Sequence, residues 1–242
     1  MNNFEKSKKS KKFVAVLLAA YNGEKFLEEQ IDTILAQEDI DLELFISIDI
    51  STDKTYEKCK IFEKKYKKVT VLPYGETFGN AAKNFFRLIK DVDFDNFDYV
   101  AFSDQDDLWD KKKLFHATDQ MQKKNFDGFS SDVVAFWENG KEKYIKKSWP
   151  QKKFDYFFES AGPGCTYVLK TNALNQFKNY LINNWNLVNT VKFHDWIIYA
   201  FFRNLNYHWK IDSLPMVRYR QHSVNEFGAN SDLKSYKKRV IL

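Results

Sequence analysis

Three carboxylates form the chemically most suggestive cluster in the chain. An apolar, strand-like run from Tyr99 to Ser103 is followed by Asp104, Asp106 and Asp107. Like charges this close repel and raise one another's pKa, so the cluster favours solvation or a bridging hard cation such as Mg²⁺ or Mn²⁺. An acidic surface turn is the alternative, and it is the more frequent meaning of an isolated Asp-x-Asp.

The segments around this cluster alternate between strand and helix patterns. Apolar strands are predicted at residues 13–20, 42–49, 69–72 and 99–103, with amphipathic helices between them. This alternation predicts an α/β fold, with a Rossmann-like, mostly parallel central sheet covered by helices on both faces. Ligands bind such sheets beyond the carboxyl ends of the strands, where Asp49 and Asp104 both fall.

The second half of the chain has a less regular pattern. The predictions are a helix from Lys113 through Met121, a surface loop at 141–153, strands at 133–137, 165–169 and 214–219, and helices at 173–182 and 195–202. We find no repeat, linker or sharp boundary. A single domain over residues 13–228 is therefore expected, between basic tails at 1–12 and 229–242.

Composition narrows the class of protein. The chain has 242 residues, of which 44% are hydrophobic and 17% aromatic, so it is expected to fold into a substantial core. It contains neither a run of roughly 18 apolar residues nor a signal-peptide pattern, and we expect a cytoplasmic protein. Cys59 and Cys165 lack disulfide-framework or metal-ligand spacing and are interpreted as small core residues.

The net charge of +5 comes from basic residues concentrated at the two ends of the chain. No nucleic-acid-binding signature accompanies them, so a nucleic-acid partner is not expected. Peripheral contact with an anionic membrane fits better, since each lysine near such a surface contributes about 1 kcal/mol. A solvated tail that aids solubility is an equally good interpretation of the N-terminal run.

Five short polar or glycine-containing segments lie at predicted strand ends or helix starts. They are Ala20-Tyr21-Asn22-Gly23, Asp49 with Ser51-Thr52-Asp53, Gly79 to Phe86, Asp104 to Trp109, and His194-Asp195-Trp196. Their order resembles that of the family 2 inverting glycosyltransferases, and is most similar to the rhamnosyltransferase-like members that build bacterial surface polysaccharides. The resemblance spans about residues 13–228. It implies the GT-A fold, with a nucleotide-sugar-binding half at 13–113 and an acceptor-binding half at 114–228.

The resemblance also implies a metal site with Mn²⁺ or Mg²⁺ as cofactor. Asp106 is then the direct ligand, Asp104 lies near the ribose or the waters of the metal, and His222 approaches the metal or the diphosphate. A divalent cation stabilises the negative charge that develops on a departing nucleoside diphosphate. Asp107 is expected to cap the following turn instead.

Four residues match the donor-binding positions of the family. Tyr21 would stack on a pyrimidine, and Asp49 would hydrogen-bond the base or ribose. Lys83 would lie near the diphosphate, and Arg220 would steady the donor. The alternatives are a packed tyrosine, a capping aspartate and an ordinary exposed lysine. A partner for Asp49 is required in any case, because a charge at the end of an apolar strand is costly when unpaired.

The acceptor side rests on two segments. Asp195 matches the catalytic base that takes a proton from the acceptor hydroxyl. His194 would orient or tune it, Trp196 would form a wall of the acceptor site, and Gly164 and Cys165 would line the same side. Asp195 could also cap the helix that follows, and the glycines before Cys165 could form a plain turn.

These expectations combine into one function. The chain would transfer rhamnose or another hexose from a dTDP- or UDP-sugar to a saccharide acceptor, expected to be lipid-linked, at the inner face of the cell membrane. The alternative is a degenerate carbohydrate- or membrane-binding protein. It is favoured by Ile48 and Ile50, because the family often has acids and glycine at this strand end.

Overall fold

The apolar runs predicted as strands form the middle of a seven-stranded sheet. The computed structural model describes residues 11–222. Along the chain the elements are β1 (Lys12–Ala20), α1 (Leu27–Leu35), β2 (Ile40–Ile48), α2 (Thr55–Lys65), β3 (Val69–Val71), α3 (Ala81–Asp91), β4 (Tyr99–Ser103), β5 (Leu108–Trp109), α4 (Lys113–Lys124), β6 (Gly128–Ser131), β7 (Val133–Trp137), β8 (Glu142–Ile145), η1 (Asp155–Phe157), η2 (Gly164–Thr166), β9 (Val168–Lys170), α5 (Thr171–Asn183), α6 (Trp185–Val188), α7 (His194–Asn204), β10 (Trp209–Asp212) and β11 (Val217–Gln221).

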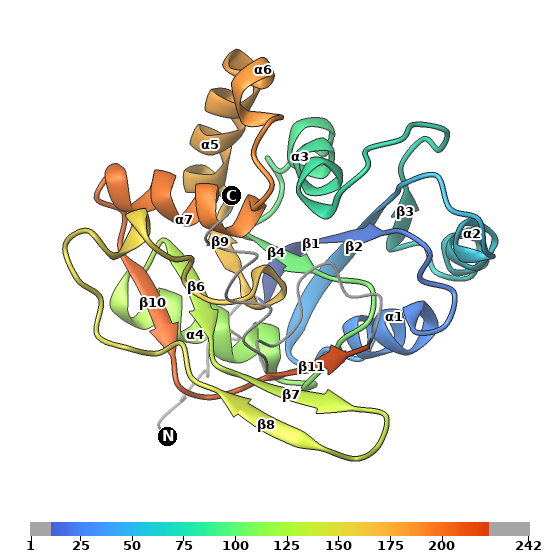
Figure 1. The fold of residues 1–242 in the computed structure, drawn as a ribbon, viewed down its shortest axis with the longest axis horizontal. Coiled ribbons are helices and arrows are strands. Elements are labelled where there is room, and N and C mark those ends of the chain that lie inside the picture. Colours follow the sequence, from blue (N-terminus) through green and yellow to red (C-terminus); the bar gives the residue numbers. More distant parts are fainter. Residues whose placement is uncertain (1–10, 223–242) are drawn as a thin grey trace, which may run out of the picture.

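The sheet has the order β10-β6-β9-β4-β1-β2-β3, with β4 as its middle strand and β1 next to it (Figure 1). Only β9 runs antiparallel to its neighbours, β4 and β6, so the prediction of a mostly parallel sheet is confirmed. The register pairs Ala20 with Ile48 and Leu18 with Ser103. The carboxyl ends of β1, β2 and β4 therefore meet at one edge.

Helices cover both faces of the sheet, as predicted. Alternate residues of β1 point to opposite faces, so Val16 belongs to one hydrophobic core and Leu17 to the other. The first core is shared with α1, α2 and α4, and the second with α3, α5 and α7. Cys59 and Cys165 are buried free thiols, which confirms their interpretation as core residues.

A second sheet, of order β5-β11-β7-β8, extends from the acidic end of β4 (Figure 1). Its outer strand β8 lies within residues 141–153, so the prediction of a loop there was wrong for Glu142–Ile145. Within residues 11–222 this strand pairs only with β7, and its side chains are largely exposed. The sequence therefore lacks the apolar alternation of a half-buried strand.

Two further strand predictions need correction. The segment 165–169 divides into η2 and β9, because the Thr166 and Tyr167 N–H groups turn back to the carbonyls of Pro163 and Gly164. The last strand begins at Val217 rather than 214 and continues to Gln221, while β5, β6 and β10 were not predicted.

The expected membrane contact of the basic termini falls mostly on residues outside the described range, and so do the end of the predicted domain and the C-terminal tail. Within residues 11–222, no helix has the length and apolar character needed to cross a membrane.

Candidate active site

The carboxylates after β4 meet the C-terminal end of the described chain. Asp106 is buried, and its Oδ2 lies 2.7 Å from Nε2 of His222, 116 positions away. Asp104, next to it, is partly exposed. The three residues predicted for the metal thus gather at one strand end. Carboxylate oxygens suit Mg²⁺ and Mn²⁺, and an imidazole nitrogen can complete such a donor set, so these residues fit a divalent cation.

Arg220 holds the acidic loop in place from β11. Its Nε donates to the carbonyl of Asp106 at 2.7 Å, and its Nη2 donates to Oε2 of Glu29 at 2.5 Å. The guanidinium carbon lies 4.5 Å from the ring centre of Phe26 and 4.6 Å from that of Phe136. Arg220 is therefore a positioning residue in this structure, and its contact with a donor stays a prediction.

Asp107 is a buried residue of the core rather than the turn cap that was expected. Its side chain is fully buried, and Oδ1 accepts the backbone N–H of Arg220 at 3.0 Å. Burial, together with the charges of Asp106 and Asp104, raises the pKa of Asp107 well above its usual range. The cause of the error is long-range: the partner lies 113 residues away on β11.

Asp104, Asp107 and Cys165 form a compact group, with one ligand atom of each lying within 4.8 Å of the others. Burial raises the pKa of the Cys165 thiol, so this sulfur stays protonated. A protonated thiol is a poor ligand for a hard cation. This argues against Cys165 as a metal ligand, and the ligand set Asp106, Asp104 and His222 stays a prediction.

Lys113 is a buried neighbour of this group that sequence reasoning missed. Its ammonium lies 3.4 Å from the ring centre of Trp109, and its Nζ makes no hydrogen bond within the described chain. Burial lowers the pKa of Lys113 to about 7, opposed by the neighbouring Cys165 and Asp107. No local pattern signals this environment, because a lysine that starts a helix is ordinarily exposed.

Gln105, the middle residue of the Asp-x-Asp, joins β4 to β1. Its Nε2 donates to the carbonyl of Tyr21 at 2.8 Å, and its Oε1 accepts the Tyr21 N–H at 2.8 Å. A Cβ on Gly23 would lie 2.2 Å from this Oε1, so a larger residue there would displace the Gln105 amide from its present position. The Tyr21 side chain is 54% exposed, as a stacking residue must be.

Asp49 is buried at the end of β2 and receives three backbone N–H groups. Oδ1 accepts from Ile50 at 2.8 Å and from Phe78 at 2.9 Å, and Oδ2 accepts from Gly79 at 2.7 Å. The partner required for its charge is thus the segment before α3. Contact of Asp49 with a base or ribose stays a prediction, as does the role of Lys83, which is partly exposed in the first turn of α3.

The acceptor-side residues gather at the start of α7. Burial raises the pKa of Asp195, opposed by hydrogen bonds from the Trp196 N–H, at 2.8 Å, and from the Ser160 side chain. The His194 ring stacks on Phe85 with centroids 4.0 Å apart, and burial lowers the pKa of this imidazole to about 3. His194 is therefore neutral and packs at the helix start, and its role on the acceptor side, orienting or tuning Asp195, stays a prediction.

The short turn η2 brings the two halves of the site together. A Cβ on Gly164 would lie 2.5 Å from Nε2 of His194 and 3.4 Å from Cβ of Asp195. The next residue, Cys165, contacts Asp107 on the metal side. The proposed base and the acidic loop therefore flank one three-residue turn, although they are far apart in sequence.

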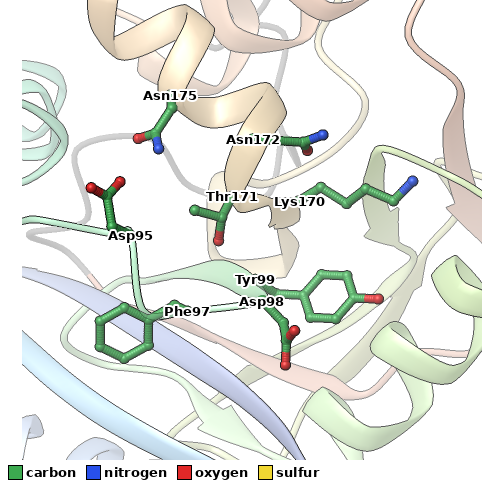
Figure 2. Close-up of a pocket in the computed structure, with 8 residues that line it drawn as sticks. All are labelled: Asp95, Phe97, Asp98, Tyr99, Lys170, Thr171, Asn172 and Asn175. Atoms are coloured by element: carbon green, nitrogen blue, oxygen red, sulfur yellow. The ribbon is translucent and has the colours of Figure 1, made fainter.

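A separate hollow lies at the amino end of β4 (Figure 2). It is lined by Asp98 and Tyr99 below the start of α5, where Thr171 and Asn172 project. Because the acidic loop follows the carboxyl end of the same strand, this hollow is at the opposite edge of the sheet. It contains none of the predicted site residues.

The parallel sheet, its acidic strand end and an adjoining carboxylate on a helix start define a GT-A glycosyltransferase. The family model described as glycosyl transferase family 2 matches residues 15–181. The chain belongs to this family, and the family and fold predicted from the sequence are confirmed.

One sequence relative and two solved structures of similar fold illustrate the similarity. The dTDP-rhamnosyl transferase RfbG of Shigella flexneri is 47% identical over 226 residues, which is 93% of this chain and 78% of RfbG. The structure of Staphylococcus aureus TarS residues 1–349 with UDP-GlcNAc has a TM-score of 0.66 at 18% identity, over 88% of this chain and 60% of that one. Pyrobaculum calidifontis PcManGT, with GDP-Man and Mn²⁺, has a TM-score of 0.59 at 17% identity, over 91% and 59%.

Proposed function

We propose that this protein is an inverting, metal-dependent glycosyltransferase that transfers rhamnose from dTDP-rhamnose in bacterial surface polysaccharide synthesis. The carrying observation is the 47% identity to a dTDP-rhamnosyl transferase across 93% of the chain. A UDP-sugar is the second candidate donor, because the fold neighbour TarS was solved with UDP-GlcNAc.

The donor would sit over the strand ends of β1, β2 and β4. Tyr21 offers an exposed aromatic face for a pyrimidine, held at its backbone by Gln105. Asp106, Asp104 and His222 would hold the Mn²⁺ or Mg²⁺. When bound, this cation neutralises charge on the diphosphate as the bond to the sugar breaks. Arg220 fixes the loop that carries these ligands.

Asp195 would act as the base for the acceptor hydroxyl. Its carboxylate accepts that proton while the oxygen attacks the anomeric carbon from the side opposite the nucleotide, which inverts the configuration. Burial raises the pKa of Asp195 and makes the carboxylate a stronger base. The Trp196 N–H fixes its orientation.

We assign the acceptor to a lipid-linked saccharide at the cytoplasmic face of the cell membrane. Gly164, Cys165 and Trp196 are the candidate residues around it. The basic termini of the sequence support contact with an anionic membrane.

The test is a thermal-shift series with dTDP-rhamnose, UDP-sugars and GDP-sugars, each with and without Mn²⁺. A ligand that binds the folded state raises the melting temperature, and dTDP-rhamnose with Mn²⁺ should give the largest shift. A shift with GDP-sugars alone would refute the assignment of a pyrimidine donor.

Donor hydrolysis separates the enzyme from the degenerate binding protein. The proposed enzyme should release dTDP slowly from dTDP-rhamnose with Mn²⁺, and the Asp106→Asn variant should not. If no sugar nucleotide releases its nucleotide, the non-catalytic alternative is favoured. That alternative rests on Ile50, which is exposed just after β2 where the family often has an acid or glycine.

A further inference from the structure

We propose that residues 141–158, called here the aromatic loop, dock this protein onto an anionic membrane surface. Four of its aromatic side chains project into solvent: Trp149 is 59% exposed, Phe154 52%, Phe157 63% and Phe158 79%. In Figure 1 most of the aromatic loop is the yellow segment that leaves β8 and runs along the margin of the molecule towards α7. Large aromatic side chains gathered in this way mark an interaction surface.

Lysines alternate with the aromatic residues. The aromatic loop has six lysines and two carboxylates, Glu142 and Asp155, which pair with Arg218 and Arg203. The ammonium of Lys146 lies 4.1 Å from the ring centre of Trp149, and that of Lys153 lies 5.2 Å from that of Phe154. Cations beside aromatic rings match a bilayer interface with anionic headgroups.

The backbone beneath these side chains is firmly held. Asp132 accepts the N–H groups of Lys147 at 2.5 Å and Ser148 at 2.7 Å. Arg203 on α7 donates to Asp155 at 2.8 Å and to the carbonyl of Lys152 at 3.0 Å. The exposed rings are therefore presented by an ordered frame, so docking requires little further ordering of the chain.

The aromatic loop is also continuous with the acceptor side of the site. The indole N–H of Trp196 donates to the carbonyl of Tyr156 at 2.7 Å, and Ser160, just beyond the loop, hydrogen-bonds Asp195. Docking would turn Asp195 towards the membrane, where a lipid-linked saccharide arrives. This consequence rests on the proposed function, whereas the docking itself does not.

The test is cosedimentation of the full chain with vesicles of phosphatidylcholine, with and without phosphatidylglycerol at about 30%, in the absence of substrates. The aromatic variant changes Trp149, Phe154, Phe157 and Phe158 to serine. We expect it to bind at least about tenfold more weakly. The matched control changes exposed apolar residues elsewhere, Ile61, Phe115 and Leu187, to serine, and should bind like the wild type.

A lysine variant tests the electrostatic part. Each lysine near an anionic surface contributes a factor of about five, so changing Lys146, Lys152 and Lys153 to glutamine should weaken binding to the anionic vesicles about 100-fold. The control changes the exposed Lys64, Lys67 and Lys124 to glutamine. All variants keep the basic termini, so a difference between the two sets must come from the aromatic loop.

Trp149 gives a direct readout of contact. Lipids brominated on their acyl chains should quench tryptophan fluorescence of the wild type, and the Trp149→Phe variant should bind equally but be quenched less. Equal quenching of the two, or wild-type vesicle binding by the aromatic and lysine variants, would overturn the proposal.

Hydrolysis of dTDP-rhamnose by the same variants separates this proposal from the proposed function. The aromatic and lysine variants should hydrolyse the donor like the wild type. If even the wild type fails to hydrolyse it, the proposed function is refuted, while the vesicle results still decide the membrane surface. If the aromatic and lysine variants bind vesicles like the wild type but bind a soluble oligosaccharide more weakly, the aromatic loop is a glycan-binding surface, and membrane docking is overturned.

Discussion

Replacing Gly23 by alanine should break the two hydrogen bonds that join Tyr21 to Gln105. The new Cβ would lie 2.2 Å from Oε1 and 2.6 Å from Cδ of the glutamine, so the amide must move away. Both bonds to Tyr21 measure 2.8 Å, and both depend on the present position of that amide. The variant therefore loosens the attachment of β1 to the acidic loop without altering either partner.

The expected loss follows from these two bonds. An intramolecular hydrogen bond contributes about 0.5–1.5 kcal/mol to stability, and Tyr21 is exposed enough for water to replace part of it. A loss of about 1–2 kcal/mol in the free energy of unfolding is therefore expected. For a chain of this size, that lowers the melting temperature by roughly 2–8 °C.

A double-mutant cycle with Gln105→Ala tests the cause. Gln105→Ala alone removes the same two bonds, and it also removes the atoms that the new Cβ would meet. Gly23→Ala should then change the stability of the Gln105→Ala protein by less than about 0.5 kcal/mol, as measured by urea unfolding of the four proteins. An equal loss in both backgrounds would refute the reasoning. Calorimetry should also show weaker binding of dTDP to either single variant.

Three further predictions concern ionisable groups in and near the proposed site. Asp195→Asn keeps most of the capping ability, and it should lower kcat at least about 100-fold with unchanged affinity for dTDP. In the wild type, kcat/KM should fall as the pH drops through the pKa of Asp195. That pKa lies above the usual value of about 3.9, because burial raises it. Asp106→Asn should abolish the Mn²⁺-dependent part of dTDP binding, measured by calorimetry with and without the metal. Burial lowers the pKa of Lys113 to about 7. Between about pH 7 and 8.5 the unfolded chain therefore binds more protons than the folded protein, so the free energy of unfolding should rise with pH. Urea unfolding of the Lys113→Met variant should show a smaller rise.

The strands and helices of the half of the fold proposed to bind the donor could be predicted from local sequence pattern. The β1, β2 and β4 segments are apolar runs that require burial on both faces, and a parallel sheet between helices provides it. Once these strands are parallel, their carboxyl ends share an edge. A shared site for Asp49 and Asp104 therefore follows from the strand pattern alone.

The contacts that complete the site could not be predicted in this way. His222 meets Asp106, and Arg220 meets Asp107, across more than 110 residues. Such long-range contacts depend on where β11 pairs in the second sheet. The sequence pattern within β4 or β11 does not predict that pairing. The burial of Lys113 has the same origin, since its environment is assembled from segments distant in sequence.

The sequence by itself thus determined the family, the parallel sheet and the acids at its edge, because apolar periodicity and motif order are local properties. The tertiary structure alone decided that Gln105 fastens Tyr21, that Asp107 is buried beside Cys165, and that the aromatic loop stands exposed beside α7. The physical reason is that burial is a property of the assembled molecule: the same aspartate or phenylalanine lies inside or outside according to which distant segments pack against it.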